Sequence, residues 1–446
     1  MSEATPLLNG TLLAPNNRTT PSWVKTRATV WSLLTLLFIA ALVLVGVQRH
    51  LPDSWAPFFG NLPRDPLLAA NVILSTSPII DGHIDLPFEV REVFANNLTA
   101  FNLNKRMPGH VDIPRLREGK VGGFFWSVYV PCPNPAVAGP DFLNATWRVR
   151  DTLEQIDVTR LLVEEYSDTF HFATNADQTF DAIQKGKISS LIGIEGAHQL
   201  GNSLPVLRMY QALGAKYLTL THSCHNAFAD SCGPSTTPLP PLHYGLSSLG
   251  ESLIAELNRL SMFVDLSHTS DLTMKAALRL SKAPVIWSHS SARGVFNHPR
   301  NVPDDVLELV GTGKGQKDAV IMVTFVGVFL APEGAATIST VADHIEHIAR
   351  VAGKKHVGIG SDYDGTSSLP SGLEDVSKLP ALFADLIKRG WTRRELSDLA
   401  GGNVLRVMRE MERVGAGLRK GGAKPSFDVY EKREDLPEWP YTVLPF

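Results

Sequence analysis

Eight short apolar runs, each ending in polar residues or glycine, recur along the chain from Pro78 onward. Near-continuous apolar runs of this length are typical of parallel strands that are buried on both faces of a sheet. We therefore expect a buried parallel sheet. The runs cover residues 78–85, 121–130, 188–195, 215–222, 261–268, 283–289, 319–328 and 356–362.

Helical patterns lie between most of these runs. Apolar residues recur three and four positions apart over 148–166, 246–260 and 340–352. Strands that alternate with helices indicate parallel βαβ units, and eight such units predict an α/β fold of the (β/α)8 TIM-barrel type. The glycine-rich stretch at 311–315 lacks the spacing of a phosphate-binding loop, so we expect an exposed turn there.

Residues 30–47 form an uncharged run of 18 residues, long enough as a helix to span a bilayer core. The basic residues Arg18, Lys25 and Arg27 precede it, which favours a cytoplasmic N-terminus and an exported remainder. A cleaved signal peptide is the alternative, but its apolar region should begin nearer the N-terminus. We expect a single-pass type II membrane protein with its large domain lumenal or extracellular, at the plasma membrane or a vacuolar or endosomal membrane.

This organisation predicts five segments: a cytoplasmic tail (1–29), a transmembrane signal anchor (30–47), a linker (48–70), the barrel (71–419) and a C-terminal extension packed on it (420–446). Two sequons, at Asn97 and Asn144, fall on the exported side and are predicted glycosylation sites. A net charge of −3 gives no support for nucleic-acid binding, and three cysteines exclude a dense disulfide scaffold.

Four of the predicted strand ends carry five metal-ligand side chains in total. Residues i and i+2 of a strand point to one face, so His83 and Asp85 can converge on one ion. A single histidine at a strand end is usually a hydrogen-bonded core residue, but a set at one barrel mouth favours a metal centre of the zinc type. If Glu195 is shared, the set divides into two sites of three ligands each. The candidate ligands are His83, Asp85, Glu195, His268 and His289.

Other histidines have different expected roles. The motif His344-Ile-Glu-His347 matches neither helix pattern of zinc proteases and predicts a solvated helix face. His198 follows Glu195 by three residues and is expected in a neighbouring loop or behind the ligands.

The motifs at these strand ends occur in a familiar order. They include DGHIDLPF, IEGAHQL, YLTLTHSCHNAFADS, VDLSHTS, PVIWSHSSA, RNVPDD and GIGSDYDG. Through them, and through VGGFFWSVYVPC at 121–132, the chain resembles the membrane (renal) dipeptidase family of binuclear zinc peptidases. The resemblance implies a (β/α)8 barrel that hydrolyses dipeptides with two Zn²⁺ per chain, bridged by Glu195 and a water or hydroxide. It places His83 and Asp85 on one ion and His268 and His289 on the other.

The resemblance also implies roles around the metals. His222 corresponds to a histidine that contacts the substrate and polarises the reacting carbonyl, and Arg300 to the arginine that receives the substrate carboxylate. Asp362 corresponds to the aspartate that contacts the bridging water and the substrate amine; it serves with His222 and Glu195 in catalysis. The family disulfide maps onto Cys132 and Cys224, which leaves Cys232 unpaired. Members are often dimers, so a homodimer is expected.

Two features depart from the family pattern. The run at 319–328 lacks the asparagine and aromatic residue that relatives often carry, and the proline-rich loop at 232–243 looks individual, so specificity is open. One alternative function is that of another binuclear barrel hydrolase acting on cyclic amides, lactones or esters, which usually carries His-x-His and a carboxylated lysine. The other is a catalytically retired membrane receptor, which should have lost a ligand.

Overall fold

The computed structural model describes residues 22–48, 61–144, 146–234, 239–433 and 435. The chain forms two compact units that divide between Pro63 and Arg64. In the first unit, helix α1 (Ser22–Gln48) includes the apolar run at 30–47, and its side chains Trp31 and Phe38 are exposed. Among the described residues, no helix is both long and apolar enough to cross a membrane. The transmembrane anchor is therefore not confirmed.

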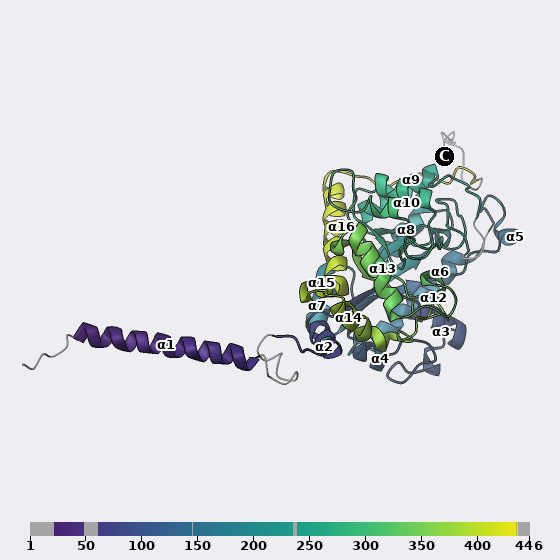
Figure 1. The fold of residues 1–446 in the computed structure, drawn as a ribbon. Helices are drawn as coiled ribbons and strands as arrows, with labels where there is room; N and C mark the ends of the chain where they lie inside the picture. The colour runs from purple at the N-terminus through teal and green to yellow at the C-terminus, as the bar shows by residue number, and fades with distance from the viewer. Residues whose placement is uncertain (1–21, 49–60, 145, 235–238, 434, 436–446) are drawn as a thin grey trace, which may run out of the picture. The chain divides into compact units, whose positions relative to one another are not determined.

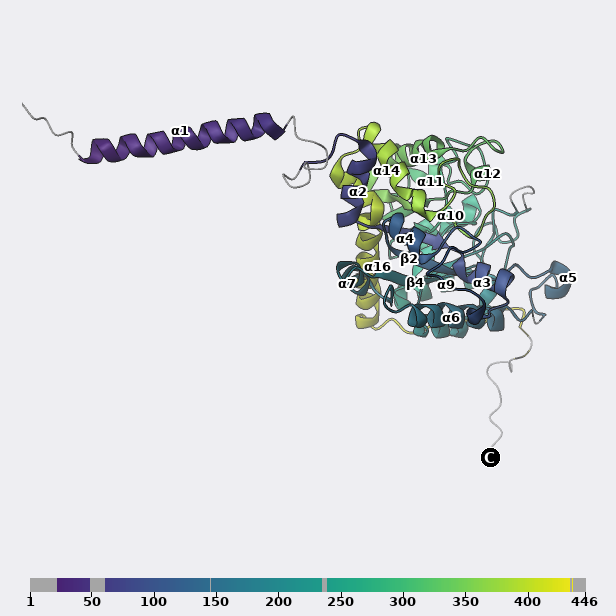
Figure 2. The same cartoon turned by 90° about the horizontal axis from the view of Figure 1, so that it is seen from below.

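The second unit is a closed barrel of parallel strands with helices around it (Figures 1 and 2). Neighbouring strands pair in the order β2-β1-β9-β8-β7-β6-β5-β4, and β4 pairs with β2 to close the ring. Each of the eight predicted runs contains one barrel strand, which confirms the (β/α)8 prediction. The strands are β1 (Ile79–Ile84), β2 (Val121–Val128), β4 (Ile188–Glu195), β5 (Ala215–Thr219), β6 (Phe263–Asp265), β7 (Val285–Trp287), β8 (Ala319–Val323) and β9 (Val357–Ile359).

A short additional strand, β3 (Phe170–Phe172), was not predicted. It pairs with Ile188–Ser190 in the first half of β4, whereas β5 pairs with the second half from Ile192 onward. Because β2 occupies the other edge of β4, β3 lies beside the barrel wall rather than in the ring. Three residues are too few to give a periodic signal in the sequence.

The predicted helices 148–166, 246–260 and 340–352 correspond to α6, α9 and α13, within two residues at each end. Two of them begin with a side-chain cap: Ser247 accepts from the Gly250 N–H, and Thr337 forms a capping box with Thr340.

The α-helices of the barrel unit are α2 (Pro66–Thr76), α3 (Leu86–Phe94), α4 (Ile113–Glu118), α5 (Pro135–Ala138), α6 (Arg148–Glu165), α7 (Ala176–Gln184), α8 (Leu204–Ala212), α9 (Ser248–Leu260), α10 (Asp271–Leu280), α11 (Asp304–Leu307), α12 (Gly327–Leu330), α13 (Ile338–Val351), α14 (Leu379–Lys388), α15 (Arg393–Ser397) and α16 (Asn403–Lys420).

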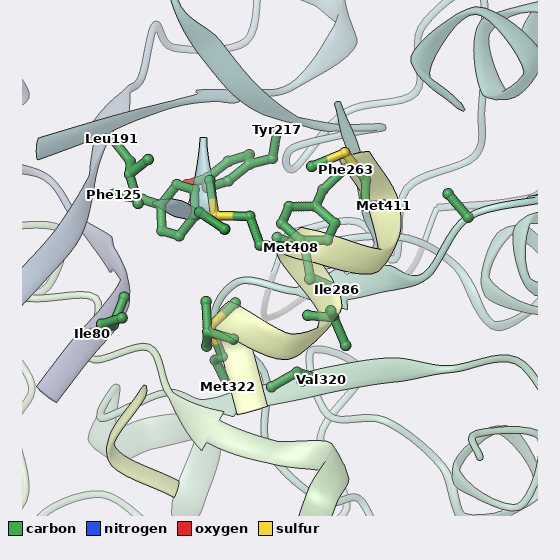
Figure 3. Close-up of a cluster of buried hydrophobic side chains, with 14 of the residues drawn as sticks. Ile80, Phe125, Leu191, Tyr217, Phe263, Ile286, Val320, Met322, Met408 and Met411 are labelled. Carbon is green, nitrogen blue, oxygen red and sulfur yellow. The ribbon is translucent and has the colours of Figure 1, made fainter. Parts of the chain in front are cut away.

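Helix α16 packs against the early parts of the strands. Figure 3 shows its Met408 and Met411 among apolar side chains such as Ile80 of β1 and Phe263 of β6, and all four belong to one buried cluster. Burial of a side chain of this size contributes about 1.5–3 kcal/mol. The apolar face of α16 therefore covers this end of the barrel, and the polar strand ends gather at the opposite one.

Candidate metal centre

Five ligand-type side chains converge at the C-terminal ends of the barrel strands. His83 and Glu195 lie in β1 and β4, Asp85 follows β1, and His268 and His289 follow β6 and β7 within three residues. Parallel strands all direct their C-terminal ends to one face of the barrel, so residues far apart in sequence meet there. All five side chains are buried.

The two carboxylate oxygens of Glu195 face different partners. Its Oε2 lies 3.5 Å from His83 Nε2. Its Oε1 lies 3.1 Å from His268 Nε2 and 3.3 Å from His289 Nε2. Asp85 Oδ2 lies 3.3 Å from the same nitrogen of His83. One carboxylate thus separates two groups of donors, which is the arrangement that a bridging ligand needs.

Several donor atoms in this cluster have no partner in the protein. His83 Nδ1 is hydrogen-bonded to the Tyr217 hydroxyl at 2.8 Å, but its Nε2 is buried without a hydrogen bond, as is Asp85 Oδ1. Leaving a buried polar atom unpaired costs about 1–3 kcal/mol. Imidazole nitrogens and carboxylate oxygens are ligands that zinc and similar cations prefer. The residues present therefore fit a metal centre.

The donor set is larger than the sequence predicted. Within this cluster, ligand atoms that lie within 4.8 Å of one another form three groups, and two of these include His222 or Asp362. His222 Nε2 is 3.8 Å from Glu195 Oε1, and Asp362 Oδ1 is 3.9 Å from His83 Nε2. The structure thus brings His222 and Asp362, both predicted to act in catalysis, against the five predicted ligands. The groups are His83–Glu195–His289, Glu195–His222–His268 and His83–Asp85–Asp362.

The backbone at this site is strained. His268 and Asp362 have φ values of 64° and 66°, in the left-handed region that a residue with a side chain avoids at a cost of about 1–3 kcal/mol. Gly365 approaches the carboxylates so closely that a Cβ there would lie 2.2 Å from Asp85 Oδ2 and 2.5 Å from Asp362 Oδ1. Two residues of the site thus adopt a strained backbone conformation, and position 365 requires glycine, so that these side chains can lie close together.

Burial shifts the pKa values of several groups in the cluster. It raises the pKa of Glu195, and it raises the pKa of Asp362 to about 7. Burial, together with the nearby positive charge of Arg300, lowers the pKa of His268 and His289 well below the usual value. Neutral imidazoles are ready to ligate, and a bound cation would favour the ionised carboxylates.

A cavity of about 420 Å³ opens above the cluster. Polar groups form one part of its lining, and an apolar wall that includes Phe88, Tyr129 and Val328 forms the other. A few convergent polar groups beside an apolar wall are typical of a site for a small molecule. The polar lining residues include Asp85, Glu195, His222, His268, Arg300 and Asp362.

Arg300 supplies a buried positive charge to this cavity. Its Nη2 donates to the His289 carbonyl at 3.2 Å, and its guanidinium lies 5.3 Å from the centre of the Phe329 ring. The buried Nε has no hydrogen-bond partner. A guanidinium held by a carbonyl and a ring retains donors that can bind a carboxylate.

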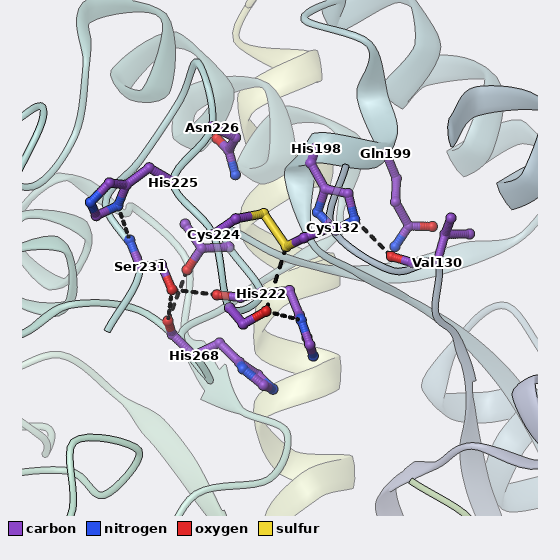
Figure 4. The surroundings of a disulfide bond; sticks show 12 residues. Val130, Cys132, His198, Gln199, His222, Cys224, His225, Asn226, Ser231 and His268 are labelled. Carbon is purple, nitrogen blue, oxygen red and sulfur yellow. Dashed lines mark hydrogen bonds between the residues drawn. A yellow bond between two sulfur atoms is a disulfide. The ribbon is translucent and has the colours of Figure 1, made fainter. Parts of the chain in front are cut away.

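A disulfide joins Cys132, after β2, to Cys224, after β5, as the resemblance implied (Figure 4). Ser223 connects it to the site: its Oγ lies 3.7 Å from Cys132 Sγ and 3.1 Å from His222 Nδ1. The crosslink therefore holds together two segments that line the cavity. Cys232 is a free cysteine.

The histidines of helix α13 correct one prediction. His344 and His347 are buried, not solvated, because this face of the helix packs onto the barrel unit. His344 Nδ1 accepts from the Ala292 N–H at 3.0 Å, and its Nε2 donates to the Leu330 carbonyl at 3.1 Å. His347 Nε2 pairs with Asp304 at 2.7 Å.

His198 lies in a short 3-10 helix (Ala197–Leu200), with Nε2 hydrogen-bonded to the Val130 carbonyl at 2.8 Å. Figure 4 shows it beside the disulfide, whose sulfurs are bonded to each other and offer no thiolate. It is therefore a neighbour of the site, as expected from its place after Glu195, and not one of the clustered donors.

Sequence reasoning missed the groups that support the ligands. Ser127 Oγ donates to Glu195 Oε2 at 3.2 Å, and the Tyr217 hydroxyl contacts His83. Sequence reasoning also did not single out Asp265, which is fully buried at the end of β6. A charged residue is rarely buried in a core unless it is paired. An aspartate inside an apolar strand run was therefore the signal in the sequence that could have identified Asp265.

Comparisons with known proteins agree with this geometry. The pattern of the membrane dipeptidase family (peptidase family M19) matches residues 68–421. A curated relative, Dipeptidase verJ of Clonostachys rogersoniana, is 42% identical over 369 residues, which are 82% of this chain and 93% of that protein.

Solved structures agree as well. A metallo peptidase from Rhodobacter sphaeroides, solved with a phosphinate mimic of the dipeptide L-Ala-D-Ala, has a TM-score of 0.65 at 27% identity, over 75% of this chain and 99% of that one. The probable dipeptidase PvdM from Pseudomonas aeruginosa shares the fold, with a TM-score of 0.70 at 21% identity, over 79% of this chain and 100% of that one.

Fold, site and comparisons together define a metal-dependent peptidase built on a TIM barrel. The chain belongs to the membrane dipeptidase family, peptidase family M19, and is a metallodipeptidase.

Proposed function

We propose that this chain hydrolyses dipeptides with two zinc ions held by His83, Asp85, Glu195, His268 and His289. The observation that carries the proposal is the geometry of Glu195. Its two carboxylate oxygens face separate groups of donor atoms at 3.1–3.5 Å. All five ligands are present and buried together, which argues against a retired receptor. When bound, a pair of such cations supplies Lewis-acid chemistry that acidifies water and stabilises negative charge.

The protein groups around the ligands bind and orient the substrate. Arg300 binds the free carboxylate of the dipeptide through its guanidinium donors. Asp362, whose Oδ1 lies 3.9 Å from His83 Nε2, accepts hydrogen bonds from the substrate amine and holds the proton that the leaving nitrogen needs, as general base and then acid. His222 lies within the same lining and hydrogen-bonds the reacting carbonyl oxygen.

Binding both termini of the substrate explains a preference for dipeptides. The cavity has a volume of about 420 Å³. Its lining includes the positively charged side chain of Arg300 and the carboxylates of the ligand cluster. A longer peptide has no carboxylate at the distance that Arg300 requires from the scissile bond. The relative from Rhodobacter sphaeroides, solved with a dipeptide mimic, supports this choice of substrate class.

The test is hydrolysis of Gly- and Cys-containing dipeptides by the purified full-length chain, with metal content measured on the same sample. We expect turnover with about two zinc ions per chain, lost with a chelator and restored by zinc. Two ions without dipeptide turnover would favour a cyclic amide, lactone or ester substrate instead. A folded protein without metal or turnover would contradict the proposal.

We also propose a location, which rests on the sequence. The uncharged run at 30–47 and the basic residues before it favour a type II anchor, with the barrel lumenal or extracellular. Asn97 and Asn144 are exposed, as glycosylation on that side requires. The test is alkaline carbonate extraction of membranes together with glycosidase digestion. Release of an unglycosylated protein by carbonate would contradict the anchor.

A further inference from the structure

Asp265 is a fully buried carboxylate at the end of β6, between β5 and β7. Its Oδ1 accepts the backbone N–H groups of Ser267 at 3.2 Å and Ser288 at 2.8 Å. Its Oδ2 accepts two hydroxyls, Thr219 Oγ1 and Ser288 Oγ, both at 2.6 Å. Four donors satisfy this carboxylate as an acceptor, so each hydroxyl directs its hydrogen toward it.

Ser288 connects Asp265 to a ligand of the metal centre. Its Oγ lies 2.8 Å from His289 Nδ1, and both residues are fully buried. A serine hydroxyl has one hydrogen. That hydrogen points to Asp265. Apart from His289, the only other acceptor for it among the described residues is Ser267 Oγ, at a longer distance of 3.3 Å. In either case the hydroxyl offers His289 only a lone pair, and Nδ1 of the neutral ring carries the proton.

The remaining nitrogen of His289 then has its lone pair free. His289 Nε2 faces Glu195 Oε1 at 3.3 Å and His268 Nε2 at 2.9 Å, in the centre of the donor cluster. We propose that Asp265 is a positioning residue that acts through Ser288 to hold His289 in the tautomer whose Nε2 binds metal. The inference rests on the proposed metal centre and goes beyond it, because it concerns what prepares a ligand before metal arrives.

A purely structural role is the alternative, since Asp265 also ties three strands together. Thr219 separates the two roles, because its hydroxyl makes the same 2.6 Å bond to Asp265 Oδ2 but Thr219 is not bonded to His289. The two roles therefore predict different effects of Thr219→Val and Ser288→Ala on the affinity for metal.

The central experiment compares Asp265→Asn with the wild-type chain, both stripped of metal and titrated with zinc against a chromophoric chelator. The amide nitrogen of asparagine donates to Ser288 Oγ, turns its hydrogen toward His289 Nδ1 and favours the wrong tautomer. We expect the affinity for one of the two ions to fall roughly 10- to 100-fold. Nitrogen-15 NMR of the metal-free chain, with His289 assigned through His289→Gln, should show the proton moving from Nδ1 to Nε2.

Ser288→Ala should weaken the same ion, and Asp265→Asn should add little to it in the double variant, because both changes interrupt one path. Thr219→Val and Ser190→Ala, the second a buried serine whose Oγ has no partner, should keep wild-type affinity. Wild-type affinity in Asp265→Asn or in Ser288→Ala would overturn the proposal. So would an unchanged tautomer, or an equal loss in Thr219→Val. If the wild-type chain itself binds no zinc, the proposed metal centre fails instead.

Discussion

The barrel contains two groups of buried histidines that differ in whether their ring nitrogens have partners in the protein. On helix α13, both nitrogens of His344 are hydrogen-bonded to the backbone. At the strand ends, His83 Nε2 has no partner, and His268 Nε2 and His289 Nε2 face each other at 2.9 Å. Two neutral imidazoles so placed have at most one proton to share between those nitrogens.

The difference shows what separates a structural histidine from a ligand. Both groups are buried, and burial lowers the pKa of His289 as it lowers that of His344. Burial and titration alone therefore do not identify a metal site. Unsatisfied donor atoms that converge on one carboxylate do, because a cation compensates them and no protein group does. The comparison predicts that substitutions at the strand ends lower the metal content and the activity, whereas substitutions on α13 lower the stability of the fold.

The largest effect is expected from Glu195→Gln. An amide cannot bridge two cations as a carboxylate does, so we expect loss of bound metal and a fall in kcat/KM of about 10³-fold or more, equivalent to several kcal/mol. Metal analysis and dipeptide kinetics measure it. Glu346→Gln, on the exposed side of α13 beside His347, is the matched control and should keep both. A fully active Glu195→Gln enzyme that still binds two ions would show that the strand-end cluster does not differ from the α13 histidines in binding metal.

Arg300→Ala should raise KM about 10- to 150-fold, because a hydrogen bond to a charged group contributes about 1.5–3 kcal/mol. Metal content should stay unchanged, since the guanidinium binds substrate and not metal. The check is steady-state kinetics with a dipeptide and with its C-terminal amide, on which the variant and the wild type should differ little. Arg293→Ala is the control, because its guanidinium is already paired with Asp271 at 2.6 Å. Equal KM values in Arg300→Ala and wild type would exclude the carboxylate role.

His344→Ala should lower the free energy of unfolding by about 2–4 kcal/mol, because it opens a cavity and leaves the Ala292 N–H and the Leu330 carbonyl unpaired. Urea denaturation of the metal-free chain measures this loss. The folded variant should still bind as much zinc as the wild type. Loss of metal in that variant would mean that α13 supports the centre and that the two regions are not independent.

The last expected effect is a pH dependence of this stability, which is only partly lost at pH 4. Burial lowers the pKa of His344 to about 4 from an ordinary value of 6.5, so the folded chain disfavours the charged ring. The unfolded chain takes up a proton first as pH falls, and stability is therefore lost between about pH 6.5 and 4. The advantage of the wild type over His344→Ala should be full above pH 6.5 and shrink by up to about 3 kcal/mol at pH 4. An advantage that is constant with pH would contradict the buried neutral ring.

Much of the fold was predictable because its signals are local. Eight apolar runs indicated eight strands, and the periodic segments indicated α6, α9 and α13. The short strand β3 was missed because three residues carry no period. The solvated face expected for His344 and His347 was wrong because polarity in sequence does not show which neighbour covers a helix.

The sequence by itself determined that His83, Asp85, Glu195, His268 and His289 would share one end of the barrel, since each lies at or just after the end of a strand and parallel strands end together. Only the tertiary structure decided which atoms remain without partners. The opposite orientation of the two Glu195 oxygens and the path from Asp265 through Ser288 to His289 depend on contacts between strands far apart in the chain. A hydrogen bond is set by distance and direction in space, and spacing along a sequence does not contain either.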